Sequence, residues 1–423
     1  MKQILRLFPK VATFQEKKIV FENFISLTTL QALGYLLPMI TLPYLTRVIG
    51  LANFGLIAFA QAFMQYFMII TDYGFSLSAT KKISMCGQNK KHTCEIFSTV
   101  MAVKLILALI CFLLLLVFIN LVPKFKQDWL VYLFSFGTVL GNTLFPVWFF
   151  QGKEKMAYIT LINSLAGIAN VICIFYYVNS PSDYIYIPLI NSIFSLISGS
   201  WALYIAFKKF DLQIVSRTYK NIREEMRAGW QLFISIVAIN AYTATRVFAV
   251  GLLTNNTITG YYSVAERIAN FIQSFPLYSF TQAVYPRLNK VFLKNKERAA
   301  KIMPKVQKIS TVGFLICLPI LFYFSPLITR LICGEPFNAV TTTLRILLIS
   351  ILFVGANAFR VQYFLICGRI DLYAKLHLTA ALIGLPLVFI LLYLFSYTGV
   401  AISTIVIEAG VFFATGVLIK KLI

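Results

Sequence analysis

Charged residues are scarce in this 423-residue sequence, and the two signs are unequal. Asp, Glu, Lys and Arg make up 13% of the chain, against roughly 25% in soluble proteins, and 38 basic residues stand against 15 acidic ones. Only two histidines occur, and the motifs GxxxxGK[ST], GxSxG and HExxH are absent. These absences exclude a soluble globular protein, ATP hydrolysis by a P-loop within this chain and the common hydrolase sites, so we expect neither an enzyme nor a cofactor.

Long apolar runs take the place of charge. The chain is 59% hydrophobic, with a mean hydropathy of +0.80. A bilayer core of about 30 Å needs about 20 apolar residues per helix, and the sequence predicts twelve such spans. They are helices and not barrel strands, because each apolar run is continuous. The predicted spans are 24–46, 54–79, 96–119, 129–150, 157–178, 185–207, 229–253, 259–284, 309–329, 341–366, 376–395 and 400–419.

The basic residues are distributed unevenly over the loops. With the N-terminus inside, the inner segments hold 29 Lys and Arg residues and the outer loops hold four. By the positive-inside rule this bias places both termini in the cytoplasm. The basic loops 208–228 and 286–308 lack an aromatic stacking platform, so we assign their charge to membrane lipid headgroups and not to nucleic acid.

The chain divides into two halves. We predict a cytoplasmic interfacial segment at 1–23, six-helix halves at 24–207 and 229–423, and a basic cytoplasmic linker at 208–228. Short echoes support the division: FGLIAFAQ (54–61) resembles TGYYSVAE (259–266) when aligned on the glycines, and FFQGK (149–153) resembles LICGR (365–369). Parallel repeats of this kind are typical of transporters that bind substrate in a central cavity between the halves.

The seven cysteines do not predict disulfides or a metal site. Most lie in or beside predicted spans or in a cytoplasmic loop, where disulfides are uncommon. Cys86, His92 and Cys94 share one loop, but their spacing matches no zinc pattern.

Three stretches carry a family resemblance. TLPYLTRVIG with FGLIAFAQAF (41–63), DYGFSLSATKKIS (72–84) and YYSVAERIANFIQSFPLYSFTQAVYPRL (261–288) closely resemble bacterial O-antigen flippases, which belong to the multidrug/oligosaccharidyl-lipid/polysaccharide exporter superfamily. The resemblance implies a multi-pass protein of the bacterial inner membrane that moves an oligosaccharide linked to undecaprenyl pyrophosphate from the inner to the outer leaflet. It also implies the polysaccharide polymerase and the chain-length machinery as partners.

Five basic residues lie within predicted spans, where a charge costs at least about 2.5–3.5 kcal/mol. Arg246 is the deepest; it shares a helical face with Asn240 and Thr243, and its forked donors suit a phosphate or an acidic sugar. The alternative for Arg246 is an internal ion pair. Lys104 lies deep in its span and is a second candidate for substrate contact. Arg267, Arg345 and Arg360 complete the set; the last two lie near the ends of one span, so snorkelling to the interface competes with substrate contact.

The polar stripe within the eighth span centres on Glu266. Glu266, Asn270 and Gln273 recur at i, i+4 and i+7, which places them on one face that cannot sensibly meet lipid. Glu266 is either half of an ion pair, with Arg267 as the first partner to test or an arginine on another helix, or a carboxylate for proton or ion coupling. Glu408 is a second carboxylate at membrane depth.

Asp72, at the inner end of the second span, is the third acidic candidate for coupling. Its competing interpretation is a helix cap or a pair with Lys81 and Lys82.

Basic residues outnumber acidic ones five to two at membrane depth, so we expect a cationic cleft. A drug exporter of the same superfamily is the nearest alternative, but an exporter of organic cations should line its cavity with acids and aromatics. A flippase of another lipid-linked precursor is also close. A polysaccharide polymerase or ligase would need a substantial periplasmic loop, and no outer loop exceeds about a dozen residues.

Overall fold

The computed structural model describes residues 14–420 except 88, 216–218, 295 and 368, and over these residues the chain is helical, with no strand. Most of the interfacial segment predicted at 1–23 lies outside the described residues. The all-α prediction is confirmed. The helices are α2 (Phe14–Val48), α3 (Gly50–Asp72), α4 (Phe75–Met85), α5 (Lys90–Leu121), α6 (Pro123–Gln127), α7 (Trp129–Leu144), α8 (Val147–Gly152), α9 (Met156–Tyr177), η1 (Pro181–Ile185), α10 (Tyr186–Phe210), α11 (Tyr219–Leu253), α12 (Asn256–Lys294), α13 (Lys296–Cys333), α14 (Asn338–Ile366) and α15 (Ile370–Lys420).

Nine helical stretches in the described part of the chain are long and apolar enough to cross a membrane, which agrees with an integral membrane protein. They cover ten of the twelve predicted spans, because one stretch, Ala374–Ile419, holds the last two. The other two predicted spans fall on α11 and α12, which are less apolar than their neighbours; in α11 only Ala244–Leu253 forms a short apolar stretch. Four of the polar side chains of these two helices line one cavity: Arg246, Glu266, Asn270 and Gln273.

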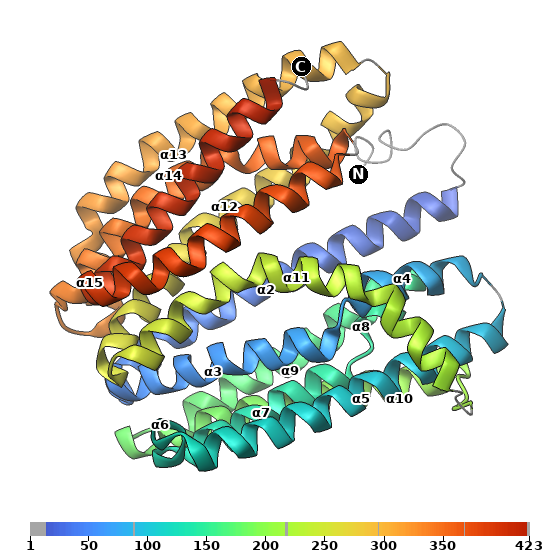
Figure 1. Cartoon of the computed structure of the whole chain (residues 1–423), viewed down its shortest axis with the longest axis horizontal. Helices are drawn as coiled ribbons and strands as arrows, with labels where there is room; N and C mark the ends of the chain where they lie inside the picture. Colours follow the sequence, from blue (N-terminus) through green and yellow to red (C-terminus); the bar gives the residue numbers. More distant parts are fainter. Residues whose placement is uncertain (1–13, 88, 216–218, 295, 368, 421–423) are drawn as a thin grey trace. The chain divides into compact units, whose positions relative to one another are not determined.

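Helix α15 is too long to be one span. Its 51 residues would extend about 77 Å as a straight helix, more than twice the bilayer core. Ser396 interrupts it with φ 54° and ψ −146°, which is not a helical conformation. In Figure 1, α15 is drawn as two limbs that are joined by a turn. The turn lies between the two predicted spans 376–395 and 400–419.

The second predicted span, 54–79, is broken. Helix α3 ends at Asp72, Tyr73 and Gly74 take left-handed φ values of 46° and 79°, and α4 begins at Phe75. A Cβ atom on Gly74 would come within 3.0 Å of the Leu232 side chain, so glycine lets the break pack closely against α11. The Tyr73 ring stacks on Phe233 of the same helix at 4.8 Å.

The chain forms two compact units. Among the described residues, the N-terminal unit holds 14–41 and Ile57–Val237, and the C-terminal unit holds Leu42–Leu56 and the chain from Ala238 onward. In the first, α10 packs against α7 and α9, α5 packs against α7, and α4 packs against α8. In the second, α14 packs against α12, α13 and α15. Unlike the predicted halves, the N-terminal unit extends through the 208–228 segment into α11, and the C-terminal unit includes the start of α3.

Two glycines join α3 to α12 within the C-terminal unit. A Cβ atom on Gly55 would lie 1.9 Å from the Asn256 carbonyl oxygen, and one on Gly260 would lie 2.0 Å from the Leu51 carbonyl oxygen. The two helix backbones therefore touch, which only glycine allows. These are the same two glycines on which the sequence echoes align.

Candidate functional site

A polar cavity of about 500 Å³ lies within the C-terminal unit, between α11, α12, α14 and α15. It falls in the range of about 300–1,000 Å³ typical of ligand pockets. Nine of its lining residues carry polar side chains, although the helices around it are largely apolar. They are Arg246, Glu266, Asn270, Gln273, Ser350, Asn357, His377, Thr404 and Glu408.

An ion pair between two helices forms one wall of this cavity. The Nε atom of Arg246 on α11 lies 3.7 Å from Oε1 of Glu266 on α12, and the two side chains are 14% and 13% exposed. The Arg246 guanidinium also donates a hydrogen bond from Nη1 to Oγ1 of Thr404 at 3.2 Å. The Arg–Glu distance exceeds the 2.7–2.9 Å of a charge-assisted hydrogen bond, so the contact is electrostatic and not a bidentate lock.

The partner of Glu266 is therefore on another helix. Arg267, its neighbour in the sequence, places its guanidinium over the ring of Phe54 at 4.9 Å, and its charge also acts on the Glu266 carboxyl group. Buried Tyr262, one turn before Glu266, donates a long 3.5 Å hydrogen bond to the Glu266 carboxylate. Of the two pairings left open by the sequence, the structure shows the one between helices.

The charge of the cavity differs from the expected cationic cleft. Its described lining contains one arginine and two carboxylates, so ionised groups leave an excess of negative charge when His377 is neutral. Glu408 and Thr404 lie one helical turn apart on the second limb of α15, and both face the cavity. Basic residues are in excess along the predicted spans but not in this cavity. Of the five, only Arg246 belongs to its described lining.

Two arginines of α14 contact aromatic rings outside the described lining of the cavity. Arg345 lies over the Phe322 ring at 5.0 Å and donates from Nε to Oγ of Ser325 at 2.8 Å. Arg360 lies over the Phe412 ring at 4.3 Å and donates from Nη1 to the Phe412 carbonyl at 3.0 Å. A guanidinium over an aromatic face gains about 0.5–2 kcal/mol, which helps to hold each cation in the membrane.

The remaining predicted residues lie apart from this lining. Asn240 is half-buried on α11, six residues before Arg246. Lys104 on α5 belongs to the N-terminal unit, where it is 2% exposed and close enough to Asp72 for their charges to interact. Asp72 accepts a hydrogen bond from the Ser76 hydroxyl at 2.7 Å, across the break between α3 and α4.

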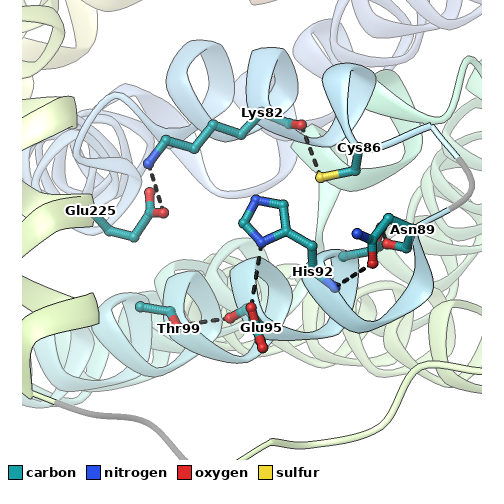
Figure 2. A network of polar contacts seen from close by, with 8 residues as sticks. Lys82, Cys86, Asn89, His92, Glu95, Thr99 and Glu225 are labelled. Carbon is teal, nitrogen blue, oxygen red and sulfur yellow. Dashed lines mark hydrogen bonds and ion pairs between the residues drawn. The ribbon is translucent and has the colours of Figure 1, made fainter.

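The expected pairing of Asp72 with Lys82 is not found. Lys82 of α4 instead forms an ion pair with Glu225 of α11, with Nζ 2.7 Å from Oε1. Figure 2 shows this pair within a polar network of the N-terminal unit. In the same network Nδ1 of His92 lies 3.4 Å from the Glu95 carboxylate, and the Cys86 thiol donates to the Lys82 carbonyl. Within the described part of the chain, no three metal-ligating side chains gather as a metal site would require.

Comparison with known proteins decides the family. The profile of the family described as "Polysaccharide biosynthesis protein" matches residues 20–292. A protein of Escherichia coli (strain K12) named "Putative O-antigen transporter" is 31% identical over 388 residues, which cover 91% of this chain and 93% of that protein. The chain belongs to the polysaccharide biosynthesis protein family. It is a membrane transporter and not an enzyme.

Other proteins are similar to this chain in sequence or in fold. A protein of Shigella dysenteriae with the same name as the Escherichia coli one is 27% identical over 391 residues, 92% of this chain and 96% of that protein. The solved structure of the lipid II flippase MurJ in an inward closed conformation matches with a TM-score of 0.76 at 14% identity, over 95% of this chain and 87% of that one. An inward-facing multidrug resistance MATE family transporter matches with a TM-score of 0.70 at 15% identity, over 90% and 95%. These two likenesses show a shared fold.

The sequence analysis missed four polar residues that line the cavity of this chain: Ser350, Asn357, His377 and Thr404. Ser350 and Asn357 stand seven residues apart on α14, and Thr404 precedes Glu408 by four, so both pairs had a helical-face signal. A single hydroxyl or amide in an apolar helix often bonds its own backbone, and that ambiguity hides the signal. No charged or amide side chain recurs with His377 at a helical spacing in the sequence, so only the structure shows that it lines the cavity.

Proposed function

We propose that this transporter moves an oligosaccharide linked to undecaprenyl pyrophosphate, such as an O-antigen repeat unit, from the inner to the outer leaflet of the bacterial inner membrane. In this proposal twelve spans form two six-helix halves with both termini in the cytoplasm, and the halves alternate access to the substrate. The family, and relatives named as O-antigen transporters, support the class of substrate. The observation that carries the proposal is the polar cavity around Arg246 between the helices α11, α12, α14 and α15.

The physical case starts from the substrate. A pyrophosphate with a glycan cannot cross hydrocarbon unaided, since an unpaired charge in a low dielectric is strongly disfavoured. Arg246 offers planar donors that match phosphate oxygens, and Asn270 and Gln273 on α12 offer amides to sugar hydroxyls. The contact of Arg246 with Glu266 is long enough to be exchanged for a phosphate, which makes Arg246 the main cation for the head group. We assign the other predicted contact residues to positions that the substrate reaches before or after this cavity. They are Lys104, Arg267, Arg345, Arg360 and Asn240.

The carboxylates supply a basis for coupling. Glu266 and Glu408 are two carboxyl groups in the cavity lining, so a proton or another cation that binds there changes the charge that a pyrophosphate meets. Asp72, beside Lys104 in the N-terminal unit, is a third carboxylate at the edge of a helix break. We therefore assign coupling to these three acids.

One observation favours a second candidate, the export of organic cations. The described lining of the cavity has two carboxyl groups and one arginine, and an excess of acidic groups favours the binding of a cationic drug. A MATE family transporter also shares the fold. Flipping of another lipid-linked precursor is compatible with the same cavity.

A cell experiment separates these functions. The chain is expressed in a bacterium that lacks its own O-antigen transporter, and surface polysaccharide is measured together with susceptibility to cationic dyes and antibiotics. We expect surface polysaccharide to return with unchanged drug susceptibility. Increased drug resistance without surface polysaccharide would support the cation exporter and overturn the flippase. Neither change, in cells whose membranes contain the folded protein, would overturn both.

A further inference from the structure

An apolar groove lies on the C-terminal unit between α12 and α13, beside the polar cavity. It has a volume of about 450 Å³. Its lining is apolar except for Ser310, and the Ser310 hydroxyl already donates to the Gly355 carbonyl at 2.9 Å. Apart from this hydroxyl and the weakly polar Cys317 thiol, the lining is hydrocarbon, so the groove suits a hydrocarbon chain.

The groove and the polar cavity share the same turn of α12. Asn270 and Gln273 face the cavity, whereas Phe271 and Ile272 between them face the groove. Four successive residues span about one turn, or about 5.4 Å of helix, so both sites lie at one level of the membrane. A molecule with a polar head in the cavity and an apolar chain in the groove would straddle one helix.

A second apolar pocket, of about 330 Å³, lies on another face of α13, between α13 and α14. Leu318 lines both the groove and this pocket, which also includes Phe322 of α13 and Leu348 of α14. The groove itself follows α13 from Ile309 to Leu321, about 18 Å at 1.5 Å per residue.

We propose that this groove on α12 and α13 holds the polyprenyl chain of the lipid-linked substrate while its head group occupies the polar cavity. The proposal rests on the proposed function and adds the position of the lipid. A membrane phospholipid keeps its head at the interface, about 15 Å from the bilayer centre, so an acyl chain of it can enter the groove without its head entering the cavity. The polyprenyl-linked glycan, by contrast, must carry a charged head and a long apolar chain through the membrane together.

Gly313 provides a direct test because it forms an open part of the groove. Apart from its own helix and chain neighbours, no atom lies within 4 Å of the position that a Cβ atom on Gly313 would take, so a side chain there would extend into the groove. Gly410 on α15 has the same open surroundings and lies outside the groove lining. Glycine is about 0.8–1.0 kcal/mol less favourable in a helix than alanine, and leucine is close to alanine, so Gly313→Leu and the matched control Gly410→Leu should both fold.

The experiment measures binding of undecaprenyl pyrophosphate and of a palmitoyl-oleoyl phospholipid to the purified full chain by native mass spectrometry. We expect Gly313→Leu to bind undecaprenyl pyrophosphate about tenfold more weakly, a loss of about 1.4 kcal/mol, while Gly410→Leu binds it as the wild type does. Phospholipid binding should be equal in all three proteins. Unchanged undecaprenyl pyrophosphate binding in Gly313→Leu, an equal loss of phospholipid, or a change in oligomeric state would each overturn the groove assignment.

A second measurement does not depend on a variant. A polyprenyl pyrophosphate with a photoactivatable diazirine on its chain should crosslink to peptides that contain 271–277 and 309–321, and crosslinks confined to other segments would overturn the proposal. The two proposals fail differently. A wild type that moves lipid-linked glycan but fails these tests would leave the flippase intact, whereas a wild type that neither binds nor moves it would overturn the function itself.

Discussion

Replacement of Glu266 by glutamine tests the role of the ion pair at the cavity wall. The change keeps the shape of the side chain and the acceptor oxygen for Tyr262, but it removes the negative charge 3.7 Å from Arg246. Both side chains are nearly buried, so Arg246 would lose its nearest counter-charge.

The structure sets the size of the effect. Removal of one partner from a buried ion pair costs about 3–5 kcal/mol. Arg246 keeps its hydrogen bond to Thr404, and the Glu408 carboxylate lines the same cavity. We therefore expect Glu266→Gln to lower the free energy of unfolding by about 3 kcal/mol, at the lower end of that range.

The assay is thermal unfolding in detergent, followed by intrinsic fluorescence, together with transport. A second change, Arg246→Gln, should restore the stability of Glu266→Gln but not its transport, because Arg246 is the proposed phosphate contact. Glu408→Gln is the matched control: it removes a carboxylate of the same cavity outside the 3.7 Å pair and should destabilise less. A Glu266→Gln protein as stable as the wild type, with undiminished transport, would refute both the structural and the coupling role of this carboxylate.

Three further predictions concern the fold. Gly260→Leu should sharply reduce the amount of folded protein seen by size-exclusion chromatography, because its side chain would meet the Leu51 backbone, whereas Gly34→Leu, with open space around it, should not; equal yields would contradict the backbone contact. Ser396→Gly should raise the unfolding temperature, because a non-glycine residue at φ 54° stores on the order of 1–3 kcal/mol, and a lower unfolding temperature would show that the turn is not strained. Reporter fusions within 208–228 and 286–308 should read cytoplasmic, and a periplasmic signal from 286–308 would overturn the twelve-span arrangement.

Much of the site was visible as spacing within single helices. Glu266, Asn270 and Gln273 recur with a helical period, and the period alone predicts that they share a face; the structure places all three on the cavity wall. The partner of Glu266 was not visible, because an ion pair between α11 and α12 depends on how two helices pack. The set of cations at the cavity was not visible for the same reason: depth in the sequence shows which cations are predicted to lie in the membrane, but not which of them face one cavity.

The breaks within spans were equally hard to predict. The run 54–79 is apolar throughout, so hydropathy predicts one helix, whereas Tyr73 and Gly74 adopt left-handed conformations that divide it. The Asp-Tyr-Gly sequence at this point has the residues of a turn, and only the packing of Gly74 against α11 decides that the turn forms. The contact between Gly55 and Gly260 had a clearer signal, since both occupy the same place in the two sequence echoes.

The central claim, that the chain flips a lipid-linked glycan through a cavity centred on Arg246, is tested most directly in proteoliposomes. These carry an undecaprenyl-pyrophosphate-linked oligosaccharide in the inner leaflet, and a lectin that cannot cross the membrane reports its arrival in the outer leaflet. We predict rapid arrival with the wild type, partial activity with Arg246→Lys, which keeps the charge but loses the planar fork, and none above protein-free vesicles with Arg246→Ala. Arrival with Arg246→Ala at the wild-type rate, from equal amounts of folded protein, would contradict the account.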